Sequence, residues 1–189
     1  MSKEYRYADG EYRLYDEELS LSLSETYEPL SIQNPPASHR VKELSFRGAL
    51  FARFLRNGEG KIDGPYYLYH AEGTVKGELF YCSGLLHGPA RYYGGDGLLL
   101  AESWWWHGRQ EGEATWRYAS GELYSRQRFR QGKWDGPQLF YGEDGSLKSL
   151  LSYREGKLDG ETLLYRADGS LERRFLYRKG QLKQVEDRT

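Results

Sequence analysis

The residues that could carry catalysis or bind a metal are few and irregularly spaced in this chain of 189 residues. A zinc or hydrolytic site needs histidine, cysteine or carboxylate groups at fixed spacings, because several donors must converge on one point. The chain has one cysteine, Cys82, and four histidines that keep no such spacing: His39, His70, His87 and His107. Carboxylates are plentiful, but no spacing selects a pair of them, and GxSxG, Walker-type and dinucleotide-binding motifs are absent. We therefore predict a protein that is not an enzyme and that needs no metal or cofactor.

Tryptophan and arginine are the residues whose pattern indicates chemistry, and that chemistry is the recognition of another protein. They recur at alternate positions of short runs, and alternate residues of a β-strand share one face. The runs change from acidic and aromatic to basic along the chain: Glu78, Phe80 and Cys82; Glu102, Trp104 and Trp106; Arg126, Arg128 and Arg130; Leu150, Ser152 and Arg154; Arg174, Leu176 and Arg178. Trp and Arg are enriched in the hot spots of interfaces, and arginine binds carboxylates bidentately. We predict a partner-binding surface made of Phe80, Glu102, Trp104, Trp106, Arg126, Arg128, Arg130, Arg154, Arg174 and Arg178.

The elements that must position these side chains follow a repeat of 24 residues, which glycine marks. One glycine series comprises Gly60, Gly84, Gly108, Gly132, Gly156 and Gly180. A second comprises Gly64, Gly88, Gly112, Gly136 and Gly160, and a third comprises Gly73, Gly97, Gly121, Gly145 and Gly169. An aliphatic column and an aromatic column keep the same period: Val75, Leu99, Leu123, Leu147 and Leu171, and Tyr81, Trp105, Phe129, Tyr153 and Tyr177. A fixed period of this size indicates a repeat architecture.

Each unit contains two short apolar runs joined by turns, which is typical of a β-hairpin. The turn signals are AEG (71–73), GDG (95–97), ASG (119–121), EDG (143–145) and ADG (167–169), in which glycine accepts a positive φ. A GxxxG box, such as GKLDG (156–160), is expected to form the connection from one hairpin to the next. No segment between Gly60 and Gly180 is long enough for a helix. The sequence therefore predicts an all-β fold, one elongated antiparallel sheet of stacked 24-residue β-hairpin repeats.

The array is expected to run over residues 40–184, followed by a short tail at 185–189. Its regular units span 60–180, and residues 40–59 are interpreted as a degenerate unit. In that unit Leu44 and Phe51 occupy the apolar columns, whereas Arg40 and Ala49 replace glycines. Terminal units of repeat arrays commonly differ in this way, because only one of their sides meets another repeat.

Residues 1–39 are expected to form an N-terminal cap with one or two strands. LSLSLS (19–24) alternates strictly, which predicts a strand with Leu19, Leu21 and Leu23 on one face. This cap is expected to cover the first hairpin or to lie across the sheet. In the second arrangement its leucines would cover Trp104 and Trp106, and the arginines would be a solvated face without a partner.

Composition narrows the class of partner. The 27 basic and 28 acidic residues give a net charge of −1, without the basic excess of a nucleic-acid binder. The 17 Tyr, 7 Phe and 5 Trp argue against disorder. MSKEYRYADGEYRLYDEE has no apolar run typical of a signal peptide, and no stretch approaches the length of a membrane helix. We expect a cytoplasmic protein with no nucleic-acid partner and no integral membrane association.

YREGKLDGETLLYRADGSL (153–171) and FRQGKWDGPQLFYGEDGSL (129–147) resemble the variant MORN repeat of the YwqK family of bacterial antitoxins. The resemblance covers about residues 57–184. It implies a MORN-like array of β-hairpins that is often encoded beside a toxin, and it brings no catalytic residues. Some similar repeat proteins look like immunity proteins against effectors delivered between bacteria. On this resemblance, the expected function is that of an antitoxin or immunity protein, which binds a cognate toxin or effector and occludes its active site.

Two other functions stay open on the sequence alone. Aromatic hairpin repeats also occur in modules that bind carbohydrate or cell-wall polymers, and a row of arginines suits an anionic lipid surface. The oligomeric state is open as well, because the end strands of an open sheet can pair with another copy. We expect either a monomer or a homodimer paired through these edges.

Overall fold

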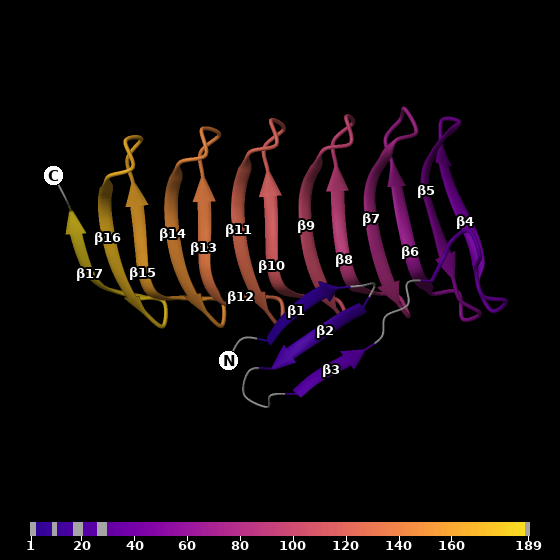
Figure 1. The fold of residues 1–189 in the computed structure, drawn as a ribbon, viewed down its shortest axis with the longest axis horizontal. Helices are drawn as coiled ribbons and strands as arrows, with labels where there is room; N and C mark the ends of the chain where they lie inside the picture. The colour runs from indigo at the N-terminus through magenta and orange to yellow at the C-terminus, as the bar shows by residue number, and fades with distance from the viewer. Residues whose placement is uncertain (1–2, 9–10, 17–20, 26–29, 188–189) are drawn as a thin grey trace.

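The computed structural model shows an all-β molecule in which neighbouring strands pair in the antiparallel sense (Figure 1). It describes the chain except for residues 1–2, 9–10, 17–20, 26–29 and 188–189. None of the described residues is helical, and so that part of the chain contains no helix of the length and hydrophobicity that crosses a membrane. The prediction of an all-β fold of antiparallel hairpins is confirmed.

A 14-stranded sheet holds most of the chain, and its strand order follows the sequence without a crossover. Strands β4 to β17 are β4 (Arg40–Phe46), β5 (Ala49–Arg56), β6 (Ile62–Tyr69), β7 (Val75–Cys82), β8 (Leu85–Tyr93), β9 (Leu99–Trp106), β10 (Arg109–Arg117), β11 (Leu123–Arg130), β12 (Lys133–Trp134), β13 (Gly136–Tyr141), β14 (Leu147–Arg154), β15 (Lys157–Tyr165), β16 (Leu171–Arg178) and β17 (Gln181–Asp187). The short β12 pairs only with β11. Residues 185–187, expected in the tail, instead continue β17, because Glu186 and Asp187 pair with β16.

The N-terminal segment forms a separate three-stranded sheet of β1 (Lys3–Ala8), β2 (Glu11–Asp16) and β3 (Leu21–Glu25). One or two strands were expected there, so the count is corrected to three. The sequence contains two further alternating runs, KEYRYA and EYRLYD, which resemble LSLSLS. They flank Asp9-Gly10, and Asp-Gly is also the hairpin signal of the array. β1 lies next to β10 (Figure 1). The contacts of Leu19, Leu21 and Leu23 with Trp104 and Trp106 lie outside what the structure describes.

Longer turns join the strands at the edge that is uppermost in Figure 1. In the turn from β6 to β7, the N–H of Gly73 donates to the carbonyl of His70 at 3.0 Å, and Gly73 has a φ of 87°. The same bond recurs at Gly97, Gly121, Gly145 and Gly169. The turns predicted from AEG, GDG, ASG, EDG and ADG are therefore confirmed, with glycine at the position that needs a positive φ.

From β7 onwards, tight two-residue turns join the strands at the opposite edge, whereas residues 57–61 connect β5 to β6. Ser83 and Gly84, with φ of 49° and 88°, connect Cys82 to Leu85. Two positive φ values in sequence define the type I′ turn, whose twist matches that of the flanking strands. The expectation that the whole GxxxG box forms this connection is therefore wrong, because only its first glycine lies in the turn.

The other residues of each box form hydrogen bonds to the tight turn of the next unit. The N–H of the turn glycine donates to a box carbonyl of the preceding unit: Gly84 to Ile62, Gly108 to Leu86, Gly132 to Gln110, Gly156 to Trp134 and Gly180 to Leu158, at 2.7–2.9 Å. Box carboxylates accept a second bond from the turn: Asp63 from the N–H of Ser83 (2.9 Å), Glu111 from Gln131 (2.7 Å) and Asp135 from Glu155 (3.3 Å). These bonds explain the repeated acidic residue, since a charged acceptor strengthens a hydrogen bond to a backbone N–H.

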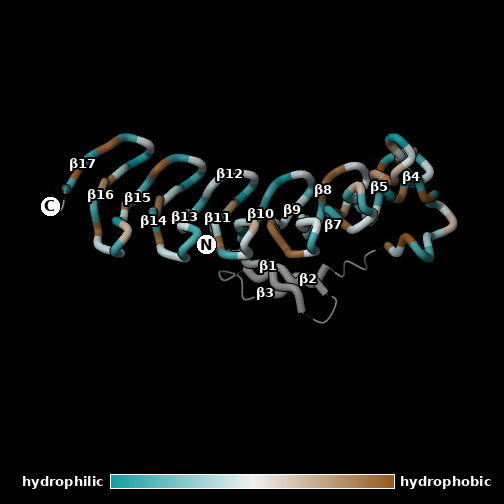
Figure 2. Tube along the Cα trace, turned by 90° about the horizontal axis from the view of Figure 1, so that it is seen from above, coloured by the Kyte–Doolittle hydropathy of each residue, from teal (hydrophilic) through white to brown (hydrophobic). Residues whose placement is uncertain are grey.

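The last glycine of each box lies inside a strand, opposite an aromatic side chain. The pairs are Gly64 with Tyr81, Gly88 with Trp105, Gly112 with Phe129, Gly136 with Tyr153 and Gly160 with Tyr177. All five glycines have positive φ, and the strand register shifts beside Gly64, Gly88, Gly112 and Gly160. A positive φ at a register shift is typical of a β-bulge, which bends the strand. The hairpins accordingly form a row of curved loops when seen from above (Figure 2).

One side of the sheet, which we call the core face, carries most of the buried residues, although Pro65 and Pro89 are buried on the opposite side. Its first row alternates large and small residues across successive strands: Leu68, Gly77, Tyr92, Ala101, Trp116, Ser125, Phe140, Ser149 and Leu164. A Cβ added to Gly77 would lie 3.3 Å from both Leu68 and Tyr92, so large side chains meet over the small residue between them. The first row is mostly half-buried, with Tyr92 39% exposed, and the next row holds the buried residues Leu79, Ala90, Ala114, Gln138 and Thr162. This interlocking is how a single-layer sheet excludes water.

The first hairpin departs from the 24-residue pattern. A two-residue turn at Arg47 and Gly48 replaces the long turn, so that Ala52, one residue earlier than the period predicts, pairs with Leu68. A slip of one residue turns a strand's side chains to the other face. Phe51 is therefore 49% exposed instead of joining the core, and Leu44 is 49% exposed because β4 is an end strand. The expected place of Phe51 in the apolar column is therefore wrong, whereas Leu44 keeps its place on the core face, opposite Ala52.

The bulge glycines differ in how much stability a substitution by alanine is expected to remove. Gly160 has a φ of 111°, and an added Cβ would lie 3.0 Å from the Cβ of Ser152, whereas Gly112 has a φ of 69° with open space around it. We expect Gly160→Ala to lower the free energy of unfolding by about 2–3 kcal/mol and the matched Gly112→Ala by about 1 kcal/mol. Urea unfolding followed by circular dichroism measures both, and equal losses would contradict this account of the bulge.

Candidate functional site

The side opposite the core face, which we call the variable face, changes in character along the array. One unbroken row of paired residues crosses it: Arg53, Tyr67, Glu78, Arg91, Glu102, Thr115, Arg126, Leu139, Leu150, Leu163, Arg174 and Glu186. The row is polar and charged over its first part, apolar at three successive leucines, and charged again at its end. Core-face columns repeat similar residues in each unit, and so this difference is specific to the variable face.

The first part of the row is a network of hydrogen-bonded polar groups. The Nε of Arg91 donates to Glu102 Oε1 at 2.7 Å, and the hydroxyl of Tyr93 donates to Glu78 Oε2 at 2.9 Å. Partial burial, followed by the bond to Glu78 and its negative charge, raises the pKa of Tyr93 to about 12. Glu102, predicted to bind a partner, is therefore engaged within the sheet, and this region presents little free charge.

The aromatic residues predicted for the site lie at the centre of the array and are half-buried. Phe80 and Trp104 pair in register with Pro65 and Pro89. Trp106 packs on histidine rings, with its centroid 4.4 Å from that of His87 and 5.1 Å from that of His107. His87 and His107 thus take part in an aromatic cluster at a tight turn. His87 occupies the position of the box carboxylate in other units, and His107 occupies the first position of the tight turn.

The second part of the row brings three leucines between two arginines. Leu139, Leu150 and Leu163 lie opposite one another on β13, β14 and β15, and all three are half-buried. Arg126 pairs with Leu139 on one side, and Arg174 pairs with Leu163 on the other. At about 4.8 Å per strand, the row from Arg126 to Arg174 spans roughly 19 Å. We call these five residues the leucine–arginine row.

The arginines of this region fall into two groups. Arg126 lies 3.3 Å from Glu113, Arg154 lies 3.8 Å from Asp159, and Arg174 is paired with Glu161 and Glu186. Among the described residues, neither Arg128 nor Arg178 has a carboxylate within ion-pair distance, and both side chains are exposed. Arg130 is exposed as well. Arg128 and Arg178 are thus cations that a carboxylate of another molecule is able to reach.

Gln138 holds the strand that carries Arg128. This fully buried amide donates to the carbonyls of Arg128 (3.0 Å) and Gly136 (3.2 Å) and accepts the N–H of Arg128 (3.2 Å). The β11–β13 ladder ends at Arg126 and Leu139, and β12 pairs with β11 only from Phe129 onwards, so the side chain of Gln138 bridges the gap between the two ladders. The backbone of Arg128 is therefore fixed, while its guanidinium remains at the surface.

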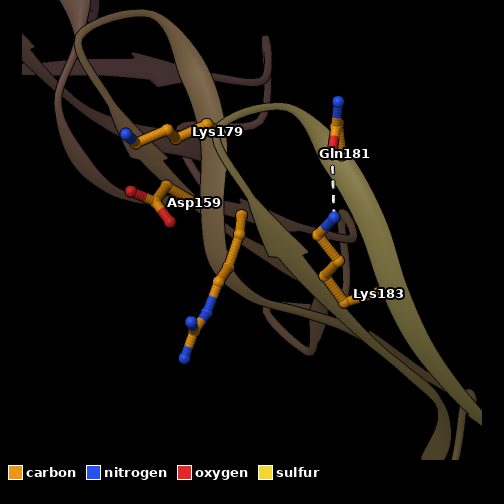
Figure 3. Close-up of a pocket in the computed structure, with 5 residues that line it drawn as sticks. Asp159, Lys179, Gln181 and Lys183 are labelled. Carbon is orange, nitrogen blue, oxygen red and sulfur yellow. Dashed lines mark hydrogen bonds between the residues drawn. The ribbon is translucent and has the colours of Figure 1, made fainter.

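A shallow hollow lies at the tight-turn edge near the last strand (Figure 3). Asp159, Arg178, Lys179, Gln181 and Lys183 line it, and Lys183 Nζ donates to Gln181 Oε1 at 2.9 Å. Three cationic side chains surround one carboxylate, so the hollow has a positive net charge. It continues the basic end of the variable face onto β17.

Titratable side chains of the described residues form a hydrogen-bonded series away from the variable face. Among the described residues, no three His, Cys, Asp or Glu side chains converge as metal ligands would. Ser38, His39 and Asp63 form a hydrogen-bonded series, with 3.0 Å from Ser38 Oγ to His39 Nδ1 and from His39 Nε2 to Asp63 Oδ2. The other oxygen of Asp63 accepts the N–H of Ser83, so this series ties the segment before β4 to the first tight turn.

Sequence reasoning missed Leu139 and Leu163, which complete the leucine–arginine row. The runs that predict the variable face lie on the second strands of the hairpins, whereas both leucines lie on first strands. Their column reads Tyr67, Arg91, Thr115, Leu139 and Leu163 in successive units, so it varies as much as the columns of the second strands. This variation along the first strands is the sequence signal that marks both leucines.

Comparison with known families identifies the repeat in two places. The MORN repeat variant matches residues 62–83 and 134–155. These matches begin 72 residues apart, which is three periods of 24. Each match contains the bulge glycine of one box and the long turn, and ends at the first residue of the next tight turn. No curated protein sequence matches the chain.

The bond between Tyr93 and Glu78 predicts a loss of stability in alkali. Because the folded pKa is raised to about 12, the contribution of Tyr93 is complete below its ordinary pKa of 10 and is lost as the pH rises from 10 to about 12. We expect about 1 kcal/mol, because water screens this partly exposed pair. Urea unfolding of wild type and Tyr93→Phe at several pH values measures the difference. A difference that stays constant from pH 8 to pH 12 would contradict the assignment, and the exposed Tyr124→Phe is the matched control.

Proposed function

We propose that this chain is a protein-binding repeat module that neutralises a cognate bacterial toxin or effector by covering its active site. The observation that supports the proposal is the leucine–arginine row, together with the exposed Arg128 beside it. Apolar residues at the centre of a patch with arginine around them match the anatomy of protein interfaces. No catalytic step, metal or cofactor is part of the proposal.

The row suits a protein surface because it offers both parts of an interface. The leucines supply apolar area that gains by leaving water, at about 25 cal/mol per Å² buried. Arg126 and Arg174 are already held by carboxylates of their own sheet, which keeps their side chains ordered before a partner arrives. Ordered side chains lose less entropy on binding. We infer that the partner presents an apolar centre with acidic groups at its rim, facing Arg128 and Arg178.

The toxin is proposed from the resemblance of residues 129–147 and 153–171 to antitoxin repeats, and the repeats themselves agree with it. A constant core face and a changing variable face allow one scaffold to fit different partners, since surface substitutions leave the hairpins intact. Cytoplasmic action fits a protein that meets its toxin inside the cell that must be protected. The alternative occupants of this face are an anionic lipid surface or a cell-wall polymer, and Arg128, Arg154 and Arg178 favour the lipid over the polymer.

The neighbouring open reading frame provides the direct test. Expressed alone it should arrest growth, and co-expression with this chain should restore growth and allow both proteins to be purified together. A neighbour that is harmless alone and does not co-purify would remove the support for a toxin. Salt-sensitive binding to anionic vesicles, or retention on cell-wall polymer, would then favour one of the alternative occupants.

Substitution in the leucine–arginine row should separate binding from folding. Leu150→Asp places a charge in the apolar centre, and we expect it to weaken partner binding at least about 30-fold, the effect of losing a hot spot of about 2 kcal/mol. Lys76→Glu is the matched control, because Lys76 is exposed and lies on the same face at β7. Calorimetry of each purified variant with the partner measures the change, with circular dichroism as the check on folding. Equal loss in both variants would place the interface elsewhere.

A further inference from the structure

The last strand of the array, β17, leaves one edge of the sheet without a neighbour in the described part of the chain. β17 pairs with β16 alone, and all of its residues except Glu186 are exposed. Leu182 and Val185, at 49% and 47% exposure, lie opposite Tyr177 and Phe175 and so belong to the core face. The free backbone groups of such an edge form a template for another strand.

The repeat itself stops at β17, which explains why these apolar residues are uncovered. The last box reads GQLKQ (180–184), with Gln184 where earlier boxes have their bulge glycine. In the preceding unit Thr162 is only 8% exposed, because Leu151 and Phe175 flank it on both sides. Val185 has Phe175 on one side and no described residue on the other. The core face is therefore incomplete by one strand.

The charges of this edge are divided between its two halves. Arg178, Lys179 and Lys183 lie at the turn and at the start of β17, where they line the hollow of Figure 3. Glu186 and Asp187 lie at its other end, beside Arg174 and Arg173 of β16. A second copy of β17, paired in the antiparallel sense, would place its acidic end beside the basic end of the first copy. Its own basic end would lie beside the acidic end of the first copy. Such self-complementarity is what a two-fold interface requires.

We propose that β17 pairs antiparallel with β17 of a second copy of this chain, around a two-fold axis close to Gln184. The pairing fills the open backbone edge, brings Leu182 and Val185 of both copies together on the core face, and joins opposite charges at both ends. The two arrays then form one continuous sheet of twice the length. The interface is small, so the dimer is expected to be weak and to depend on concentration.

The other end of the array does not offer the same match. β4 and β17 are the first and thirteenth strands of an alternating path, so they run in the same direction and head-to-tail stacking would pair them in parallel. In β4 the charged residues Arg40, Lys42 and Glu43 all lie in the first half, and LSF (44–46) carries none. A two-fold axis on β4 would set charged residues against uncharged ones.

Charge exchange across the interface provides the test. We expect wild type to show dimers that increase with concentration in sedimentation velocity experiments at low salt. Lys179→Glu/Lys183→Glu, which makes both halves acidic, and Glu186→Lys/Asp187→Lys, which makes both basic, should each dimerise at least 10-fold more weakly. Their mixture should recover the dimer, because opposite charges meet again. Lys157→Glu, an exposed change on the inner strand β15, is the matched control and should behave as wild type.

A crosslink keeps the test independent of the ion pairs that Glu186 and Asp187 make with β16. In a Cys82→Ser background, Gln184→Cys should form an intermolecular disulfide at least 10-fold faster than Lys157→Cys. Equal rates in the two variants, or a wild-type chain that stays monomeric at every concentration while Gln184→Cys does not crosslink, would overturn the proposal. Preferential crosslinking through Leu44→Cys would do the same and would move the interface to β4. None of these outcomes bears on toxin binding, which the variable face would carry in a monomer as well.

Discussion

The hydrogen bonds between each tight turn and the box before it hold the long sheet in register. A single layer of hairpins has a thin core, so strand pairing alone would leave its register weakly specified. The turn glycine donates to a box carbonyl 22 residues earlier, as Gly84 does to Ile62, and a box carboxylate such as Asp63 accepts the N–H of the neighbouring turn residue. Each unit is thereby fixed to its neighbour at one edge, independently of the residues on either face.

This fixed register allows the two faces to serve different purposes. On the core face, large residues from first strands meet over small ones from second strands, as Leu68 and Tyr92 do over Gly77. The variable face lies on the other side of the sheet from these interlocking rows, and its residues differ from unit to unit. It changes from the bonded network around Glu102 to the leucines between Arg126 and Arg174. A protein partner would therefore recognise the residues of the variable face and not the turns and core rows that all units share.

The ends of the array show what the inner units gain from having neighbours on both sides. Leu44 on β4 and Leu182 on β17 are both 49% exposed, although they lie on rows that are half-buried or buried further inside. At β17 the loss of the bulge glycine coincides with the separation of charge between Lys183 and Asp187. The proposed dimer follows from these two features, since one leaves an edge open and the other makes it self-complementary.

The sequence alone determined the period, the hairpins, the long turns and the alternation that sets Trp104 and Arg128 apart from the core, because these depend on local backbone preference and on spacing along one strand. It also supplied most of the candidate surface. Only the tertiary structure decided that Glu102 is bound by Arg91, that Leu139 and Leu163 complete a row with Leu150, and that the first hairpin slips by one residue at Phe51. Those facts depend on which residues face one another across strands and on the length of each turn, and no residue's type or position in its own strand fixes its cross-strand partner.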